Sequence, residues 1–310
     1  MSDRFWLPEY EHLMFGKDAT LQSIDEAAQI KALHMPETLY KYRSCNKHAF
    51  EALENDFLFS SSPSEFNDLF EGSIIINREK VFQNTVQKVY DKLRLEHPYL
   101  PNTFVSSYVD LANIIANTFE NPTAIYEDPA FLNTADNLNR AMISGSNKLI
   151  ESLQHNARNS YNVICFCEEY DNPVMWAHYS DNNKGFCIGY DVKRRNDNLR
   201  HLTFPVIYRD EIKLEIEDLD GLNASDNMHM LTIKSPAWSY EKEWRTLFPP
   251  NPPCNKEKMP KAKCVYMGAN ISDDNTEKID MICKKKGIAL YAMNVDISKS
   301  KYVATPVYIP

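Results

Sequence analysis

Glycine is scarce in this chain. Only eight of its 310 residues are glycine, and no two of them stand in a Gly-x-Gly arrangement. Loops that bind nucleotide phosphates need closely spaced glycines, because the backbone has to approach the phosphate oxygens. The sequence therefore excludes the dinucleotide-binding fingerprint and the P-loop, and a bound nucleotide must be held in another way.

Cysteine pairs and long apolar runs are also missing. The seven cysteines are odd in number, and none falls in a Cys-x-x-Cys pair. Cys165 and Cys167 lie in an apolar run, which favours packing on one face of a core strand. No signal peptide is recognisable, and no apolar stretch approaches the roughly 18 residues of a membrane-spanning helix. The sequence predicts reduced thiols, a cytoplasmic location and no membrane partner.

Positive net charge is absent as well. The 34 lysines and arginines are outnumbered by 43 acidic residues, which gives a formal net charge of -9. The whole molecule has no long-range attraction for nucleic acid, so a nucleic-acid substrate requires a local basic patch. Lys193 to Arg195, Arg200 and Lys284 to Lys286 can supply one, although solvated loops explain both runs more simply.

The order of apolar patterns predicts one α+β domain over residues 31–310, preceded by an N-terminal arm over 1–30 that either packs or frays. From residue 77 to about 159 apolar residues recur at helical spacing, which predicts a helical insertion. Strands are expected at 38–43, 57–60, 73–76, 161–167, 186–192, 202–208, 212–216, 264–268 and 289–295, and helices at 47–55, from Pro173 onward, 223–235 and 273–286.

The stretch from Trp238 to Phe248 concentrates two carboxylates, an arginine and four aromatic residues. Read as a strand, it places Glu241, Glu243 and Arg245 on one face, because side chains alternate. A carboxylate pair suits a site that stabilises positive charge or binds hydroxyl groups. A surface strand paired with charges on its neighbour accounts for the same pattern.

Five segments occur in a fixed order along the chain. They are LYKYRS from residue 39, LFSSSPSEFND from 58, MWAHYS with KGFCIGYD from 175, WSYEKEWR from 238 and VYMGANIS from 265. Together they resemble the bacterial domain of unknown function 2971 family over residues 38–295. Leu69 departs from the family pattern, where a proline follows the Asn-Asp pair. The family name itself implies no activity.

The layout also resembles, more distantly, that of ADP-ribosyltransferases. That resemblance implies a mixed or antiparallel β core and NAD as a substrate, bound without a glycine loop. By position, Arg43 or Tyr40 matches the early-strand residue of the NAD cleft, and His178 or Tyr179 matches its middle element. Glu243 matches the late catalytic glutamate. The Ser-Thr-Ser motif of one ADP-ribosyltransferase class is absent.

The resemblance assigns a role to each candidate. Glu243 stabilises the oxocarbenium charge, and Glu241 activates the acceptor. The candidates for binding NAD are Tyr40, Arg43, Asn67, Asp68, Trp176, His178 and Tyr179. Each has a simpler structural interpretation: the tryptophans as core anchors, His178 as a hydrogen-bonded structural residue, Asn67 and Asp68 as turn formers, and Arg43 as an ion-pair partner of a strand glutamate.

The resulting expectation is an NAD-dependent transferase that modifies a macromolecule, with nucleic acid as the first acceptor considered and protein as the second. Such a self-damaging activity fits a toxin or antiviral effector restrained by an antitoxin-like partner. Two alternatives remain open. One is a metal-dependent nuclease built on Asp68, Glu71 and the Asp191 to Lys193 triplet. The other is a non-catalytic interaction module of a defence or toxin–antitoxin system.

Overall fold

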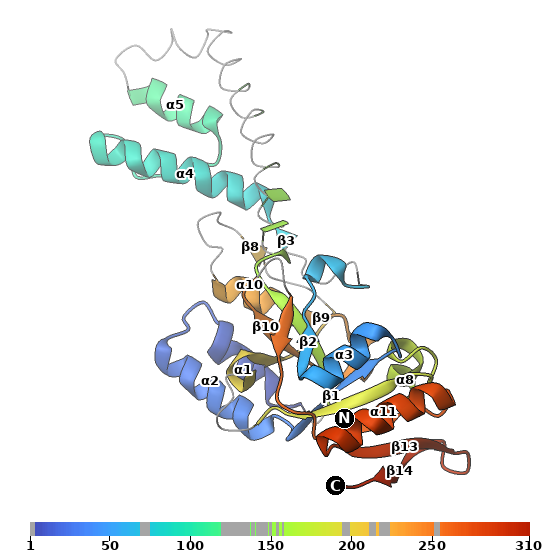
Figure 1. Cartoon of the computed structure of the whole chain (residues 1–310). Helices are drawn as coiled ribbons and strands as arrows, with labels where there is room; N and C mark the ends of the chain where they lie inside the picture. Colours follow the sequence, from blue (N-terminus) through green and yellow to red (C-terminus); the bar gives the residue numbers. More distant parts are fainter. Residues whose placement is uncertain are drawn as a thin grey trace. The chain divides into compact units, whose positions relative to one another are not determined.

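The computed structural model describes residues 4–68, 75–118, 159–193, 199–210, 215–216, 224–250 and 255–310, with scattered positions between 137 and 158. The chain divides into two compact units (Figure 1). The first comprises residues 1–72, 159–211 and 231–310, and the second comprises 73–158 and 212–230. All candidate site residues belong to the first unit.

An eight-stranded mixed sheet forms the centre of the first unit, which confirms the α+β class. One neighbouring pair, β12 and β13, is parallel, and the other neighbours in this sheet are antiparallel. In spatial order the strands are β14 (Lys301–Tyr308), β13 (Ala289–Asp296), β12 (Cys264–Met267), β5 (Phe186–Asp191), β1 (Thr38–Arg43), β4 (Asn162–Cys167), β10 (Glu243–Phe248) and β6 (Thr203–Pro205).

The central strands are buried on both faces of the sheet. Phe186 and Ile188 of β5 belong to one core cluster, while Cys187 between them belongs to another. All six residues of β10 are buried. Because side chains alternate along a strand, such burial requires cover on both sides. Strands β1, β4 and β10 therefore form a rigid support for side chains at their ends.

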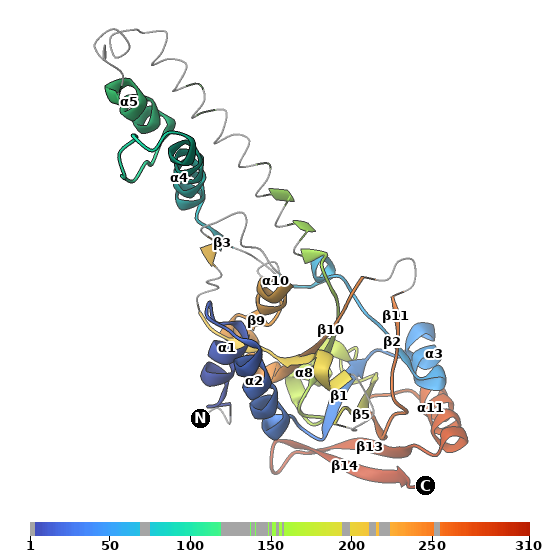
Figure 2. The same ribbon diagram turned by 90° about the vertical axis from the view of Figure 1, so that its left-hand side faces the viewer.

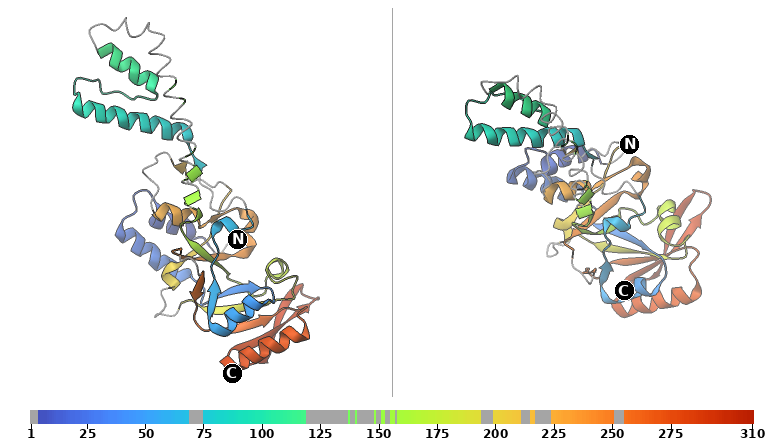
Figure 3. Two further views of the ribbon diagram at one scale, coloured as in Figure 1. Left: turned by 45° about the horizontal axis from the view of Figure 1, so that its top comes forward. Right: turned by 90° about the horizontal axis from the view of Figure 1, so that it is seen from above.

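Helices and short strands surround this sheet. In Figure 3, α11 lies along β13. The helices of the first unit are α1 (Leu7–Phe15), α2 (Leu21–His34), α3 (Lys47–Asn55), α8 (Pro173–Tyr179), α9 (Leu199–Leu202) and α11 (Asp273–Lys286), with the 3-10 turns η1 (Pro63–Glu65) and η3 (Pro236–Glu241). Two further strand pairs are β2 (Phe57–Phe59) with β11 (Lys256–Lys258) and β7 (Ile207–Tyr208) with β9 (Ile233–Lys234).

The second unit contains the helices α4 (Arg78–Glu96) and α5 (Tyr108–Thr118), which confirm a helical start to the predicted insertion. Most of residues 119–158 lie outside the described part of the chain. The unit also contains the parallel pair β3 (Ile75–Ile76) and β8 (Glu215–Ile216), and α10 (Ala224–Met230). Of the helices described, none is long and apolar enough to cross a membrane.

Helix ends follow local sequence signals. Asn46 accepts a hydrogen bond from the Ala49 amide and begins α3, as expected. Ser272 caps α11 in the same way, and Gly287 ends that helix with φ of 58°, a conformation that favours glycine. The helix expected over 223–235 was wrong in extent, because it ends at Met230 and is followed by β9. The strand β14 was not predicted.

The N-terminal segment packs against the sheet instead of fraying. Helices α1 and α2 lie side by side in Figure 2. Arg4 Nη2 donates to Glu168 Oε1 at 2.7 Å. The Trp6 ring stacks on His34 with centroids 4.8 Å apart and lies 6.2 Å from the Trp244 ring. The segment therefore covers the start of β10.

We predict that Trp6→Ala destabilises the protein by about 3–5 kcal/mol, because it removes a large buried ring and leaves a cavity beside Trp244. The neighbouring Phe5 is 80% exposed, so Phe5→Ala serves as the matched control with a small effect. Urea unfolding of both variants measures the difference. Equal midpoints for the two variants would show that the N-terminal segment does not pack on the sheet.

Candidate functional site

A cavity of about 220 Å³ lies in the first unit beside β1, β4 and β10. Glu65 at the end of η1 and residues 66–68 after it line one part of the cavity, and Tyr179 at the end of α8 lines another. Lys234 of β9, Trp238 and Glu241 of η3, and Glu243 of β10 also line it. Segments far apart in the sequence thus meet at one hollow.

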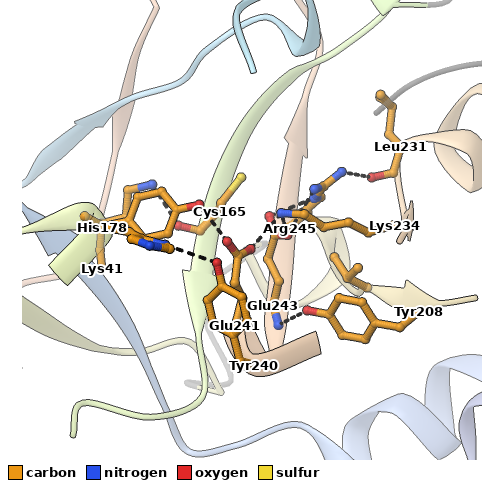
Figure 4. A network of polar contacts seen from close by, with 12 residues as sticks. Lys41, Cys165, His178, Tyr208, Leu231, Lys234, Tyr240, Glu241, Glu243 and Arg245 are labelled. Atoms are coloured by element: carbon orange, nitrogen blue, oxygen red, sulfur yellow. Dashed lines mark hydrogen bonds and ion pairs between the residues drawn. The ribbon is translucent and has the colours of Figure 1, made fainter. Parts of the chain in front are cut away.

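Four buried charged residues, Lys234, Glu241, Glu243 and Arg245, form what we call the Lys234 network (Figure 4). Lys234 Nζ lies 2.7 Å from Glu241 Oε2 and 3.0 Å from Glu243 Oε2. Arg245 Nε and Nη2 donate to the two oxygens of Glu243 at 2.8 and 3.0 Å. All four residues are at most 5% exposed, so their charges are compensated mainly by one another.

The backbone brings the two glutamates together in a way that strand alternation does not explain. Glu241 is the last residue of η3, and Lys242 turns the chain with φ of 43°. The strand β10 begins only at Glu243. The prediction that Glu241 shares a strand face with Glu243 and Arg245 was therefore wrong in its geometry, although Lys234 still joins the two carboxylates.

Glu243 is held firmly as a carboxylate. Burial raises the pKa of Glu243, but the charges of Arg245 and Lys234 outweigh burial and hold that pKa well below its usual range. Its backbone amide also donates to the hydroxyl of Tyr208 at 2.9 Å. Because both carboxylate oxygens accept hydrogen bonds from cations, Glu243 supplies fixed negative charge at the cavity wall.

Glu241 has a different electrostatic state. Its Oε1 accepts a 2.6 Å hydrogen bond from the Tyr179 hydroxyl, and its Oε2 accepts from Lys234. Burial and the neighbouring charge of Glu243 raise the pKa of Glu241, although Lys234 and Tyr179 act in the opposite direction. A cavity-lining carboxyl with a raised pKa is suited to proton transfer near neutral pH.

The structure gathers five of the seven predicted NAD-binding residues at the cavity, namely Tyr40, Arg43, Asn67, Asp68 and Tyr179. Both predicted catalytic glutamates line it as well. The expected ion pair of Arg43 with Glu241 or Glu243 is not formed, since Lys234 and Arg245 occupy those carboxylates.

The other two predicted residues do not line the cavity. Trp176 is fully buried, its ring meets Tyr42 edge to face, and its indole nitrogen donates to the Tyr170 carbonyl at 2.7 Å. It is a core residue and cannot stack on a ligand. His178 is exposed, with its Nδ1 lying 3.2 Å from the Tyr240 hydroxyl. Its role there is that of a hydrogen-bonded surface residue.

Sequence reasoning missed two cavity lysines, Lys41 and Lys234. Lys234 was assigned to a helix, although it lies in the short strand β9. Lys41 lies within LYKYRS, where only Tyr40 and Arg43 were predicted to bind the ligand. Alternation along β1 places Lys41 and Arg43 on one face, and that signal could have paired them.

The alternative metal site is not assembled by the residues that the structure describes. Within those residues no three His, Cys, Asp or Glu side chains gather as metal ligands. Asp191 pairs with Thr38 at the first residue of β1, whereas Arg43 is the last residue of that strand. Asp68 lines the cavity and Asp191 does not. Glu71 and residues 194–195 lie outside the described residues.

The model of a family described as "Protein of unknown function (DUF2971)" matches residues 175–246. This segment contains Tyr179 and the whole Lys234 network, and over these residues the match supports the family that the ordered motifs indicate. The description names no activity. No curated protein and no solved structure shows significant similarity to the chain.

We predict that Glu243→Gln lowers stability by about 3–5 kcal/mol at pH 7, because it leaves Arg245 and Lys234 buried with half of their countercharge removed. A lowered pKa in the folded state stabilises the protein above the unfolded value of 4.5, and this stabilisation is lost as pH falls through the folded value. The difference between wild type and variant should therefore shrink from pH 7 to pH 3.

Chemical denaturation at the two pH values tests this prediction. Glu277→Gln, at an exposed position on α11, provides a control that changes little at either pH. A stability difference for Glu243→Gln that stays constant between pH 7 and pH 3 would contradict the depressed pKa.

Proposed function

We propose that this protein is an NAD-dependent ADP-ribosyltransferase that acts through the cavity beside β10. The observation that carries the proposal is the pair of buried carboxylates, Glu241 and Glu243, held by one lysine at a cavity wall. The distant resemblance in motif order to ADP-ribosyltransferases supports the choice of NAD. The glycine-poor sequence is consistent with a nucleotide site that lacks a phosphate-binding glycine loop.

The reaction would break the bond between nicotinamide and ribose C1′. Nicotinamide leaves with the bonding electrons, and positive charge develops on the ribose ring. Fixed negative charge stabilises such an oxocarbenium-like state when it is already oriented before the reaction. Glu243 fits this role because Arg245 and Lys234 fix its position at the cavity wall.

Glu241 would act on the acceptor. A new bond forms between the acceptor heteroatom and ribose C1′, and the acceptor proton passes to a base. The pKa of Glu241 is raised and that of Glu243 is lowered, so Glu241 accepts a proton more readily than Glu243 near neutral pH. The hydroxyl of Tyr179 on Oε1 orients the carboxylate, so Tyr179 is a positioning residue in this scheme.

The dimensions of the cavity favour partial enclosure of the substrate. Its volume of about 220 Å³ lies just below the range of roughly 300–1,000 Å³ typical of ligand pockets. In the proposed reaction the nicotinamide and its ribose would occupy this cavity, and the rest of NAD would extend from it. A macromolecular acceptor can approach a reacting carbon near an opening more easily than one in a sealed chamber.

We predict that purified protein transfers label from labelled NAD to an acceptor supplied as RNA, DNA or cell lysate, or releases nicotinamide. Glu241→Gln should reduce the rate by about 100-fold or more, the magnitude typical of losing a general base. Scintillation counting of acceptors and chromatography of nicotinamide provide the two readouts.

The control is Glu277→Gln on the exposed surface of α11, which should retain the wild-type rate. Absence of both transfer and nicotinamide release by the wild type, with no rise in melting temperature on adding NAD, would reject the proposal. Unchanged activity in Glu241→Gln would reject the role assigned to that carboxyl.

A further inference from the structure

Lys41 and Arg43 are two residues apart on β1, so their side chains leave the strand on the same face. Both residues line the cavity described above. Strand geometry separates their Cα atoms by about 7 Å. Two cations at this spacing give the β1 side of the cavity a concentration of positive charge.

Among the residues that the structure describes, the ammonium group of Lys41 has a single protein acceptor. Its Nζ donates to the Cys165 carbonyl oxygen at 2.8 Å (Figure 4). No carboxylate of the described residues lies within ion-pair distance of it. An ammonium has three N–H donors, and this arrangement uses one of them. Burial lowers the pKa of Lys41 and the adjacent Arg43 lowers it further, with partial compensation from Cys165 and the more distant glutamates.

The charge of Arg43 has fewer protein acceptors than that of Lys41 among the described residues. Its Nε is buried without a hydrogen-bond partner, and within the described ranges its guanidinium forms no hydrogen bond or ion pair with a protein group. Burial lowers the pKa of Arg43, while Tyr190 opposes that shift. Arg43 also borders a second hollow, which Asn46 and His48 line. The buried Nε of Arg43 has lost its hydration and no protein acceptor replaces it, which is costly.

The buried cations of this unit, Lys31, Lys234 and Arg245, have several hydrogen-bond or ion-pair acceptors each. Lys31 Nζ donates to three backbone carbonyls, at 3.0, 3.3 and 2.9 Å. Lys234 contacts two carboxylates, and Arg245 contacts one carboxylate and the Leu231 carbonyl. The fold thus supplies each of these buried cations with acceptors, including Lys234, which lines the cavity. Lys41 and Arg43 line the same cavity with fewer acceptors, and a ligand could supply the rest.

We infer that Lys41 and Arg43 form a subsite for the phosphate group of a phosphorylated substrate. The planar fork of the Arg43 guanidinium suits two phosphate oxygens, and Lys41 adds a point charge with two unused donors. The inference rests on the proposed function in taking this cavity as the substrate site. It gives a role to Lys41, which takes no part in the proposed reaction, and it defines the ligand class by its phosphate alone.

The test measures binding of inorganic phosphate and pyrophosphate to the full chain by isothermal titration calorimetry. Wild type should bind both in a saturable manner, and more weakly as salt rises. Lys41→Met and Arg43→Met should each weaken binding about tenfold or more, as expected for removal of a charge-assisted hydrogen-bond donor. Lys285→Met is the control, since that lysine is 71% exposed in its ion pair with Glu54 and should leave binding unchanged.

Stability without ligand separates a binding role from a structural one. Removing a part-buried ammonium that has no carboxylate partner should leave the melting temperature of Lys41→Met equal to or above that of wild type. A lower melting temperature together with unchanged phosphate binding would show that Lys41 acts structurally through Cys165, and would overturn the inference.

The inference and the proposed function fail in different ways. Phosphate binding that both variants lose, in a protein that does not consume NAD, supports the subsite and rejects the transferase. NAD turnover in a wild type that binds neither phosphate nor pyrophosphate, or whose variants bind both unchanged, rejects the subsite and supports the transferase.

Discussion

The site depends on one interaction, the contact of Lys234 with the carboxylates of both Glu241 and Glu243. Two buried carboxylates without a cation between them would repel each other, and one would take up a proton. Lys234 keeps them together and links β9, η3 and β10 at the cavity wall. Such a buried ionic cluster contributes little net stability, because desolvation offsets the attraction, but it fixes geometry. Its position at a cavity is consistent with a functional purpose.

The same cluster gives its two glutamates, Glu241 and Glu243, different pKa values. Glu243 receives two cations and stays ionised, while Glu241 shares one cation and receives a tyrosine hydroxyl. Their pKa values therefore move in opposite directions. Enzymes that need a fixed charge and a proton acceptor at one place use this kind of division. In the same cavity lining, Lys41 donates only to a backbone carbonyl and Arg43 Nε has no partner among the described residues.

The sheet gives this arrangement its precision. The cavity lies against β1, β4 and β10, which are adjacent in the middle of the eight-stranded sheet. Functional side chains on rigid strands keep their positions better than side chains on free loops. The aromatic residues Phe66 and Trp238 add to this, because their rings lie 5.3 Å from the Arg245 guanidinium and 4.9 Å from Lys234 Nζ. The rings limit the access of water to the Lys234 network.

The sequence by itself determined the features that depend on neighbouring residues. The caps at Asn46 and Ser272 set the starts of α3 and α11, the apolar runs located the main strands, and the ordered motifs indicated the family and both glutamates. Tertiary structure alone decided the rest. Lys234 reaches the glutamates only because β9, η3 and β10 converge, and Trp176 is withdrawn into the core by packing against Tyr42. Whether a buried cation finds an acceptor depends on residues far away in the chain, as for Lys41 and Cys165, so no local pattern could reveal it.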